Sequence, residues 1–162
     1  TNGVTDKAPS EDAVFDALAL KLNTATMFAT TIVQNNAAFN PADSLSYFIP
    51  PLTYLGVANG STSRTESAPL TGELYAVAIE ARAGTILGSS EDVTIRITNE
   101  TTTSFVEVVV RFDALTNFYF FTLGTTLAVT GGNQLSYAIR PTIWATNPTG
   151  CGLKINSSFK TI

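Results

Sequence analysis

The residues best suited to chemistry in this sequence are Trp144, Arg140 and Asn147, and the chemistry they suit is the binding of a sugar. Trp144 is the only tryptophan among the 162 residues. Its indole can stack on the apolar face of a sugar ring, while Arg140 and Asn147 can form hydrogen bonds with the hydroxyl groups around that ring. Trp144 could instead fill the core or lie in a subunit interface, and these are the commoner uses of a tryptophan. We therefore treat the three residues as a candidate ligand site.

Asparagines in the loops are a second candidate for ligand contact. Asn35, Asn36, Asn99 and Asn133 stand, like Asn147, between apolar segments of the sequence. Their side-chain amides can bind sugar hydroxyls, but asparagine is also a favourable turn residue because its side chain bonds to the nearby backbone. Both interpretations are open at this stage.

Catalytic arrangements are scarce in this sequence. It contains no histidine, which removes the commonest general base and the commonest transition-metal ligand. The single cysteine, Cys151, lies between two glycines, with only Lys154 as a nearby positive charge. No catalytic residue, metal ligand or cofactor site is therefore predicted.

Carboxylate pairs, which a glycosidase needs, have a simpler explanation here. Glu91 and Asp92 are adjacent, so in a strand they point to opposite faces. Other carboxylates share strands with arginines, as Glu107 does with Arg111, and ladders of ion pairs between neighbouring strands account for them.

Composition excludes several further classes. Charged residues make up 14% of the chain and the net charge is −4, with no run of Lys or Arg, so binding to a nucleic-acid backbone is not expected. No apolar stretch reaches the 18 residues or so that a membrane-spanning helix requires, so membrane insertion is not expected. A chain of this length is long enough for one domain with a sizeable core.

The candidate site must be positioned by β-structure, because most of the chain is rich in β-branched and aromatic residues that alternate with polar ones. The clearest alternation places Val93, Ile95 and Ile97 on one face of one strand, and Val106, Val108 and Val110 on one face of the next. Pro141 interrupts a long segment and predicts an edge strand or a bulge there. We predict strands at residues 25–33, 46–49, 52–58, 73–82, 92–98, 104–112, 115–123, 125–130, 134–145 and 153–159.

A short helix is expected at residues 10–23, before the first strand. Ser10 is a suitable N-cap, and Phe15, Leu18 and Leu22 follow at spacings of three and four, which places them on one narrow face. A helix this short is marginal alone in water, so it must pack on its own domain or on copies of itself. We predict an all-β, antiparallel, jelly-roll-like β-sandwich at residues 24–162. It is preceded by a tether and short trimerisation helix at 1–23, with Phe15, Leu18 and Leu22 at a trimer axis.

Two segments carry a resemblance to a known family. Residues 3–18, GVTDKAPSEDAVFDAL, resemble a linker that joins a trimeric shaft to a C-terminal head in bacteriophage tail-fibre and other receptor-binding proteins. Residues 72–97, GELYAVAIEARAGTILGSSEDVTIRI, also look like fibre head domains. The resemblance implies a jelly-roll head, a homotrimer, an upstream shaft or virion protein as partner, and a place on the virion outside the cell. Because the sequence starts at Thr1 without a methionine, we expect it to be a fragment or a processed piece of a longer protein.

These observations favour a non-catalytic head that recognises a bacterial surface molecule, with a glycan as the expected receptor. One alternative is a structural virion protein, such as a head fibre or a capsid decoration protein. Others are a carbohydrate-binding module of a secreted enzyme, which would not need a trimeric helix, and a hydrolase with a minimal carboxylate site, which would release soluble fragments from a polysaccharide.

Overall fold

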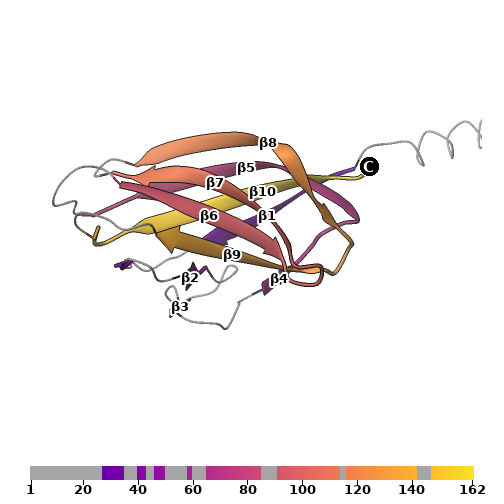
Figure 1. The fold of residues 1–162 in the computed structure, drawn as a ribbon. Helices are drawn as coiled ribbons and strands as arrows, with labels where there is room; N and C mark the ends of the chain where they lie inside the picture. The colour runs from indigo at the N-terminus through magenta and orange to yellow at the C-terminus, as the bar shows by residue number, and fades with distance from the viewer. Residues whose placement is uncertain are drawn as a thin grey trace, which may run out of the picture.

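The structure is a computed structural model that describes residues 27–34, 40–42, 46–49, 58–59, 65–84, 91–113, 116–141 and 147–162. In these ranges the chain forms ten strands and no helix (Figure 1). The strands are β1 (Phe28–Gln34), β2 (Tyr47–Phe48), β3 (Ala58–Asn59), β4 (Thr65–Ser67), β5 (Gly72–Arg82), β6 (Glu91–Asn99), β7 (Ser104–Phe112), β8 (Asn117–Val129), β9 (Gln134–Pro141) and β10 (Gly152–Lys160).

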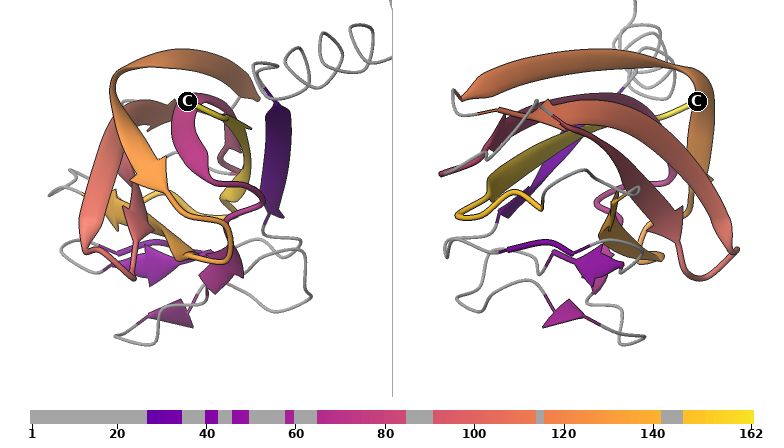
Figure 2. Two further views of the ribbon diagram at one scale, coloured as in Figure 1. Left: turned by 90° about the vertical axis from the view of Figure 1, so that its right-hand side faces the viewer. Right: turned by 60° about the vertical axis from the view of Figure 1, so that its left-hand side comes forward.

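The strands form two antiparallel sheets that pack face to face. One has the order β1-β10-β5-β8, and the other has the order β3-β2-β9-β6-β7, with β4 also paired to β9. Figure 2 shows the short strands β2, β3 and β4 together on the side of the molecule away from β8.

The pairing of the strands defines a jelly roll. Without the two-residue strands β2 and β3, eight strands remain in chain order. The first of these eight, β1, pairs with the last, β10, and the second, β4, pairs with the seventh, β9. The third and sixth strands, β5 and β8, pair next, and β6 and β7 form the central hairpin. This nested pairing, split between two sheets, is the jelly-roll arrangement. It confirms the predicted all-β, antiparallel, jelly-roll-like β-sandwich.

The core lies between the sheets and is formed by alternate residues of each strand. On β6 and β7 every second side chain is buried, as predicted from the sequence; these are Val93, Ile95, Ile97, Val106, Val108, Val110 and Phe112. The facing sheet contributes Leu74, Val77, Ile79, Leu127, Leu153, Ile155 and Phe159. A buried hydrogen bond of 2.9 Å between the hydroxyls of Thr31 on β1 and Tyr137 on β9 also ties the two sheets together. Burial of apolar surface on this scale is the main source of stability for a sandwich.

Several local predictions are wrong. Residues 117–129 form one long strand and not two, although its register with β5 is irregular between the pairs Leu74↔Leu127 and Ala76↔Thr122. The same irregularity puts Ala76 and Val77 both inside, so Tyr75 points outward although it alternates in sequence with the buried Val77 and Ile79.

The polar segment around β4 was predicted to be a loop, yet it pairs with β9 through its backbone. Pro141 neither forms a bulge nor marks an edge strand, because β9 lies between β2 and β6. It is the last described residue of β9 and pairs in register with Val93 of β6. The predicted helix at 10–23, with Phe15, Leu18 and Leu22, lies outside the described residues, as does the predicted domain boundary at residue 23.

Candidate functional site

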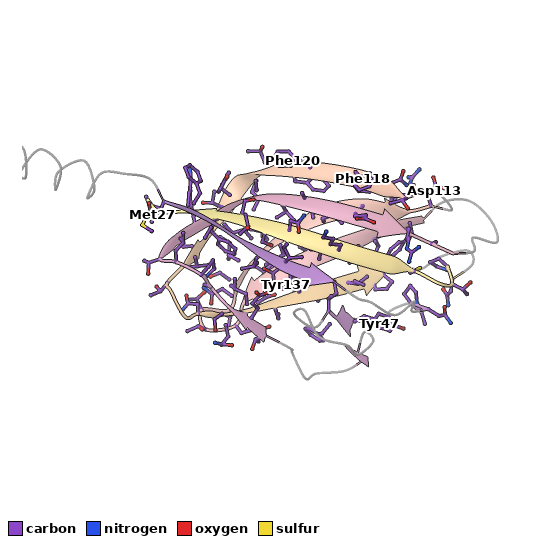
Figure 3. The ribbon with its side chains drawn as sticks, turned by 180° about the vertical axis from the view of Figure 1, so that it is seen from behind. Met27, Tyr47, Asp113, Phe118, Phe120 and Tyr137 are labelled. Carbon is purple, nitrogen blue, oxygen red and sulfur yellow. The ribbon has the colours of Figure 1, made fainter. Side chains whose placement is uncertain are left out.

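The sandwich has two distinct ends, and the preceding chain joins it at one of them. Met27 lies beside Thr161: the Met27 N–H donates to the Thr161 hydroxyl at 2.9 Å, and the Thr161 N–H donates to the Met27 carbonyl at 3.0 Å. We call this the proximal end. The opposite, distal end carries Asp113, and Figure 3 shows Met27 and Asp113 near opposite ends of the sandwich.

The distal end is built from backbone segments that bind one another. The Gly84 N–H donates to the carbonyls of Thr149 and Gly150, and the Gly150 N–H donates to Oδ1 of Asn40 at 2.8 Å. Gly150 has a φ of 64°, and a Cβ on it would lie 3.2 Å from the Cα of Gly84. A glycine at 150 therefore lets two loops approach closely at a position that favours no larger residue.

Of the three predicted ligand residues, the structure describes two. Arg140 lies near the distal end of β9, with Nη1 3.4 Å from Oε1 of Glu107, a carboxylate that also pairs with Arg96 at 2.7 Å. Asn147 is exposed at the distal end, in the segment that leads to Gly150. Trp144 lies outside the described residues. Arg140 therefore belongs to a ladder of ion pairs, while Asn147 remains available to a ligand.

Asn99 and Asn133 lie at the proximal end and bind other parts of the protein. Asn99 donates through Nδ2 to Oδ1 of Asn133 at 2.9 Å and to the Ala128 carbonyl at 3.1 Å. Oδ1 of Asn133 also accepts from the Thr130 N–H. These two asparagines act as turn residues, the alternative that the sequence left open. Asn35 and Asn36 are not described.

The outer face of the β3-β2-β9-β6-β7 sheet is charged, as the predicted ladders require. Besides the pairs of Glu107, Arg111 donates from Nε to Oδ1 of Asp92 at 2.7 Å. This hydrogen bond, followed by the positive charge of Arg111, holds the pKa of Asp92 below its ordinary value. Phe105 is exposed on the same face, but the Arg96 guanidinium lies 3.9 Å from its ring centre.

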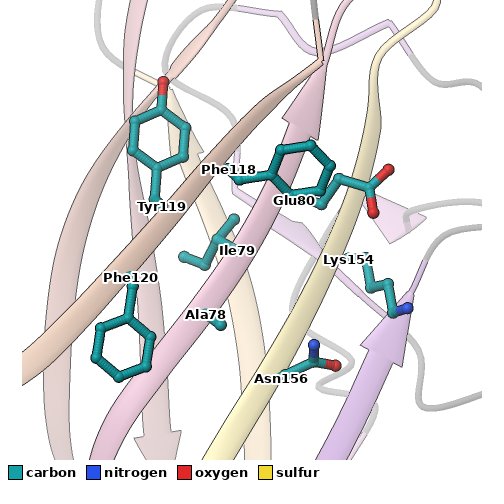
Figure 4. Close-up of a pocket in the computed structure, with 8 residues that line it drawn as sticks. All are labelled: Ala78, Ile79, Glu80, Phe118, Tyr119, Phe120, Lys154 and Asn156. Carbon is teal, nitrogen blue, oxygen red and sulfur yellow. The ribbon is translucent and has the colours of Figure 1, made fainter.

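The outer face of the β1-β10-β5-β8 sheet carries a feature that the sequence did not predict, a shallow hollow of about 360 Å³. Phe118 and Phe120 of β8 line it, together with Glu80 of β5 and Lys154 and Asn156 of β10 (Figure 4). The sequence showed a run of aromatics here, but it could not show which residues of β5 and β10 would lie beside them. We call the whole outer face of the β1-β10-β5-β8 sheet, which includes this hollow, the apolar face.

Side chains capable of catalysis are poorly placed in the described part of the chain. Burial raises the pKa of the Cys151 thiol to about 12, so the thiolate is scarcely populated near neutral pH. Glu80 and Glu107 lie on the outer faces of different sheets and cannot act as a pair. No group of three or more Asp, Glu, Cys or His residues suited to a metal occurs in the described ranges, and none of their elements is a helix able to cross a membrane.

Comparison with known proteins leaves the family open. No family model matches this chain, and no curated protein matches it. Among solved structures, the globular domain of zebrafish complement 1qA protein aligns over 82% of this chain and 97% of its own, with 10% identity and a TM-score of 0.43. An arabinose-bound α-L-arabinofuranosidase aligns over 80% of this chain and 26% of its own, with 10% identity and a TM-score of 0.37. Neither likeness is close enough to carry an argument, so the jelly-roll description depends on the strand pairing of this chain alone.

Proposed function

We propose that this chain is the receptor-binding head of a bacteriophage fibre, which assembles as a homotrimer and binds a bacterial surface glycan without turnover. The observation that carries the proposal is the separation of the two ends of the sandwich. The preceding chain enters at Met27, so the distal end is free to meet a receptor while the proximal end is attached to a shaft or virion protein.

The sequence supports the same assignment. The segment at 3–18 resembles the linker that joins a shaft to a head in fibre proteins, and in the sequence it precedes Met27, the residue at the proximal end. The charge of −4 and the hydroxyl-rich composition suit a protein that acts in water on the virion surface. The absence of histidine and the buried Cys151 thiol disfavour hydrolytic turnover of the receptor.

The test is binding of the purified, fluorescently labelled chain to a panel of bacterial cells. The expected result is saturable binding to some strains, competition by polysaccharide purified from the same cells, and no soluble fragments released from that polysaccharide. In phage assays, the chain should block adsorption to the strains that it binds. A folded trimer that binds no cell would favour a structural virion protein, and released fragments would favour a hydrolase.

Two substitutions test which end of the sandwich binds the receptor. Stacking of an aromatic on a base is worth about 1–3 kcal/mol, and a sugar stack lies at the low end, so Trp144→Ala should weaken each site by about fivefold. A trimer engages several sites at once, so the loss measured on cells should be larger than on an isolated glycan. Thr102→Ala, in the proximal turn after Asn99, is the matched control and should leave binding unchanged. Equal losses from both variants, or full binding by Trp144→Ala, would contradict a distal site built on Trp144.

A further inference from the structure

The apolar face carries large side chains that nothing in the described structure covers. Phe118 and Phe120 are 77% and 71% exposed, and they follow one another on the outward side of β8. Strand pairing continues this surface across the sheet, because Phe120 lies opposite Ala78, Ala78 opposite Asn156, and Asn156 opposite Ile32. One row of mainly apolar residues therefore crosses all four strands. Exposed surfaces of this kind mark interaction sites in soluble proteins.

The outer face of the β3-β2-β9-β6-β7 sheet differs from the apolar face in its ion pairs. Three of the four ion pairs between described residues lie there, and its exposed Phe105 is covered by the Arg96 guanidinium. Among the described residues of the apolar face, the only ion pair is that of Lys160 with Glu73, at the proximal end. The two faces differ most in their aromatics, because the most exposed ones, Phe28, Phe118 and Phe120, all lie on the apolar face.

Polar groups within the apolar face also lack partners. Oδ1 of Asn156 is buried on the floor of the hollow and accepts no hydrogen bond. Glu80 and Lys154 are neighbours in register, yet neither forms an ion pair with another described residue. The side chains of Glu80 and Lys154 are thus the polar groups of this face that a partner can engage.

We infer that the apolar face packs against neighbouring copies of the same chain, an inference that depends on the homotrimer of the proposed function. Met27 and Phe28 lead the preceding residues onto β1, which is an edge strand of this same sheet. The ring of Phe28 packs edge-on against Tyr75 on the apolar face, with centroids 6.1 Å apart. In the proposed homotrimer the segment before Met27 holds the copies together. The β1 edge of the apolar face is therefore the part of each sandwich that starts nearest to the other copies.

The geometry suits a closed ring better than a twofold pair. The β8 side of the face presents Phe118 and Phe120, whereas the β1 side presents Phe28 and Ile32. Two different surfaces that meet each other form a heterologous contact, and such contacts close into rings, including trimers. The charged outer face of the β3-β2-β9-β6-β7 sheet in each of the three copies would then lie on the exterior of the head.

The test compares paired substitutions on the two faces of the full chain. Phe118→Gln with Phe120→Gln removes the two exposed aromatics of β8 from the apolar face, and Phe105→Gln with Val109→Gln removes two exposed apolar side chains from the charged face. Aromatics at the centre of an interface are typical hot spots, so the first pair should raise the trimer dissociation constant by about a hundredfold. The second pair should leave it unchanged. Light scattering measures the assembly, and circular dichroism checks that each variant is folded.

A second measurement does not depend on those substitutions. Ala78→Cys places a thiol on the apolar face, and Thr94→Cys places one on the outer face of β6; native Cys151 is buried and contributes little background. In the assembled protein, a maleimide should label the Ala78→Cys variant about tenfold more slowly than the Thr94→Cys variant, because access limits thiol reactivity. Equal labelling rates would overturn the inference.

The outcomes separate this inference from the proposed function. A wild-type chain that is monomeric overturns the inference together with the trimer, whereas cell binding would still test receptor recognition. A stable trimer after the change of Phe118 and Phe120 overturns the inference alone. If that variant stays trimeric but loses cell binding, the apolar face is a receptor site, and the inference is again wrong.

Discussion

Glu66 and Glu73 are two carboxylates whose surroundings act in opposite directions. Burial raises the pKa of Glu66, and one of its oxygens, Oε2, is buried without a hydrogen bond. The pKa of Glu73 is lowered, first by the hydrogen bond from Thr126 and then by that from Lys160. Because a shifted pKa changes the free energy of unfolding with pH, the two residues should leave opposite signatures.

The direction of each pH effect depends on whether the folded state favours the protonated or the ionised carboxyl group. The folded state favours protonated Glu66, so its contribution is most favourable below the ordinary glutamate pKa of about 4.3 and is lost as the pH rises through the raised pKa. Ionised Glu73 is favoured instead, so its contribution is present at neutral pH and is lost as the pH falls through the lowered pKa.

We therefore expect Glu66→Gln to raise the melting temperature at pH 7, with the difference from wild type shrinking toward pH 4. Glu73→Gln should lower the melting temperature at pH 7, and its difference should also shrink in acid. Thermal unfolding followed by circular dichroism across this pH range measures both. Changes of the same sign in the two variants at pH 7 would contradict the assignment.

Alternation along β7 gives a prediction at the scale of the element. Val108 is 8% exposed and faces the core, while its neighbour Val109 is 54% exposed and faces outward. Val108→Asp would bury a charge without a partner and should prevent folding. Val109→Asp, the matched control, should fold with a nearly unchanged melting temperature. Circular dichroism of the two purified variants decides the matter, and a folded Val108→Asp variant would show that the strand faces are assigned wrongly.

The elements also show what a sequence can predict. Strands β6 and β7 were predicted closely because one face is polar and the other apolar, so the pattern alone assigns the buried side. The limits of β8 were not predicted, because aromatics occupy both of its faces. β4 was missed because it is short and polar and is held by backbone hydrogen bonds to β9. In each case the deciding contact comes from a distant part of the chain.

The candidate surfaces follow the same rule. The sequence pointed to Asn147, which is exposed at the distal end, but not to the ion pair that engages Arg140. It did not indicate the apolar face, since Phe120, Ala78, Asn156 and Ile32 come together only through the pairing of four strands. Asn99 and Asn133 looked like loop residues open to a ligand, yet they bind each other.

Assembly is a property of the whole molecule, and the sequence before Met27 makes a prediction about it. If Phe15, Leu18 and Leu22 form a seam between copies, Leu18→Asp should place a charge at the trimer axis and weaken the trimer. Most of the β-sheet signal in circular dichroism should remain, because the sandwich forms its core without this segment. Ala19→Asp, on another face of the predicted helix, is the control and should stay trimeric. A wild-type chain that light scattering shows to be monomeric at micromolar concentration would contradict the seam.

The place of β10 between β1 and β5 has a consequence for how the protein is made. During synthesis, β1 and β5 emerge from the ribosome well before the strand that joins them. With translation at about 5–20 residues per second, the nascent chain therefore exposes two unpaired strand edges for some seconds. The apolar face, which β10 completes, can exist only after that strand has been inserted. Contact between copies through this face must then follow the synthesis of β10, so we expect ribosome-bound chains that lack β10 to bind chaperones and not one another.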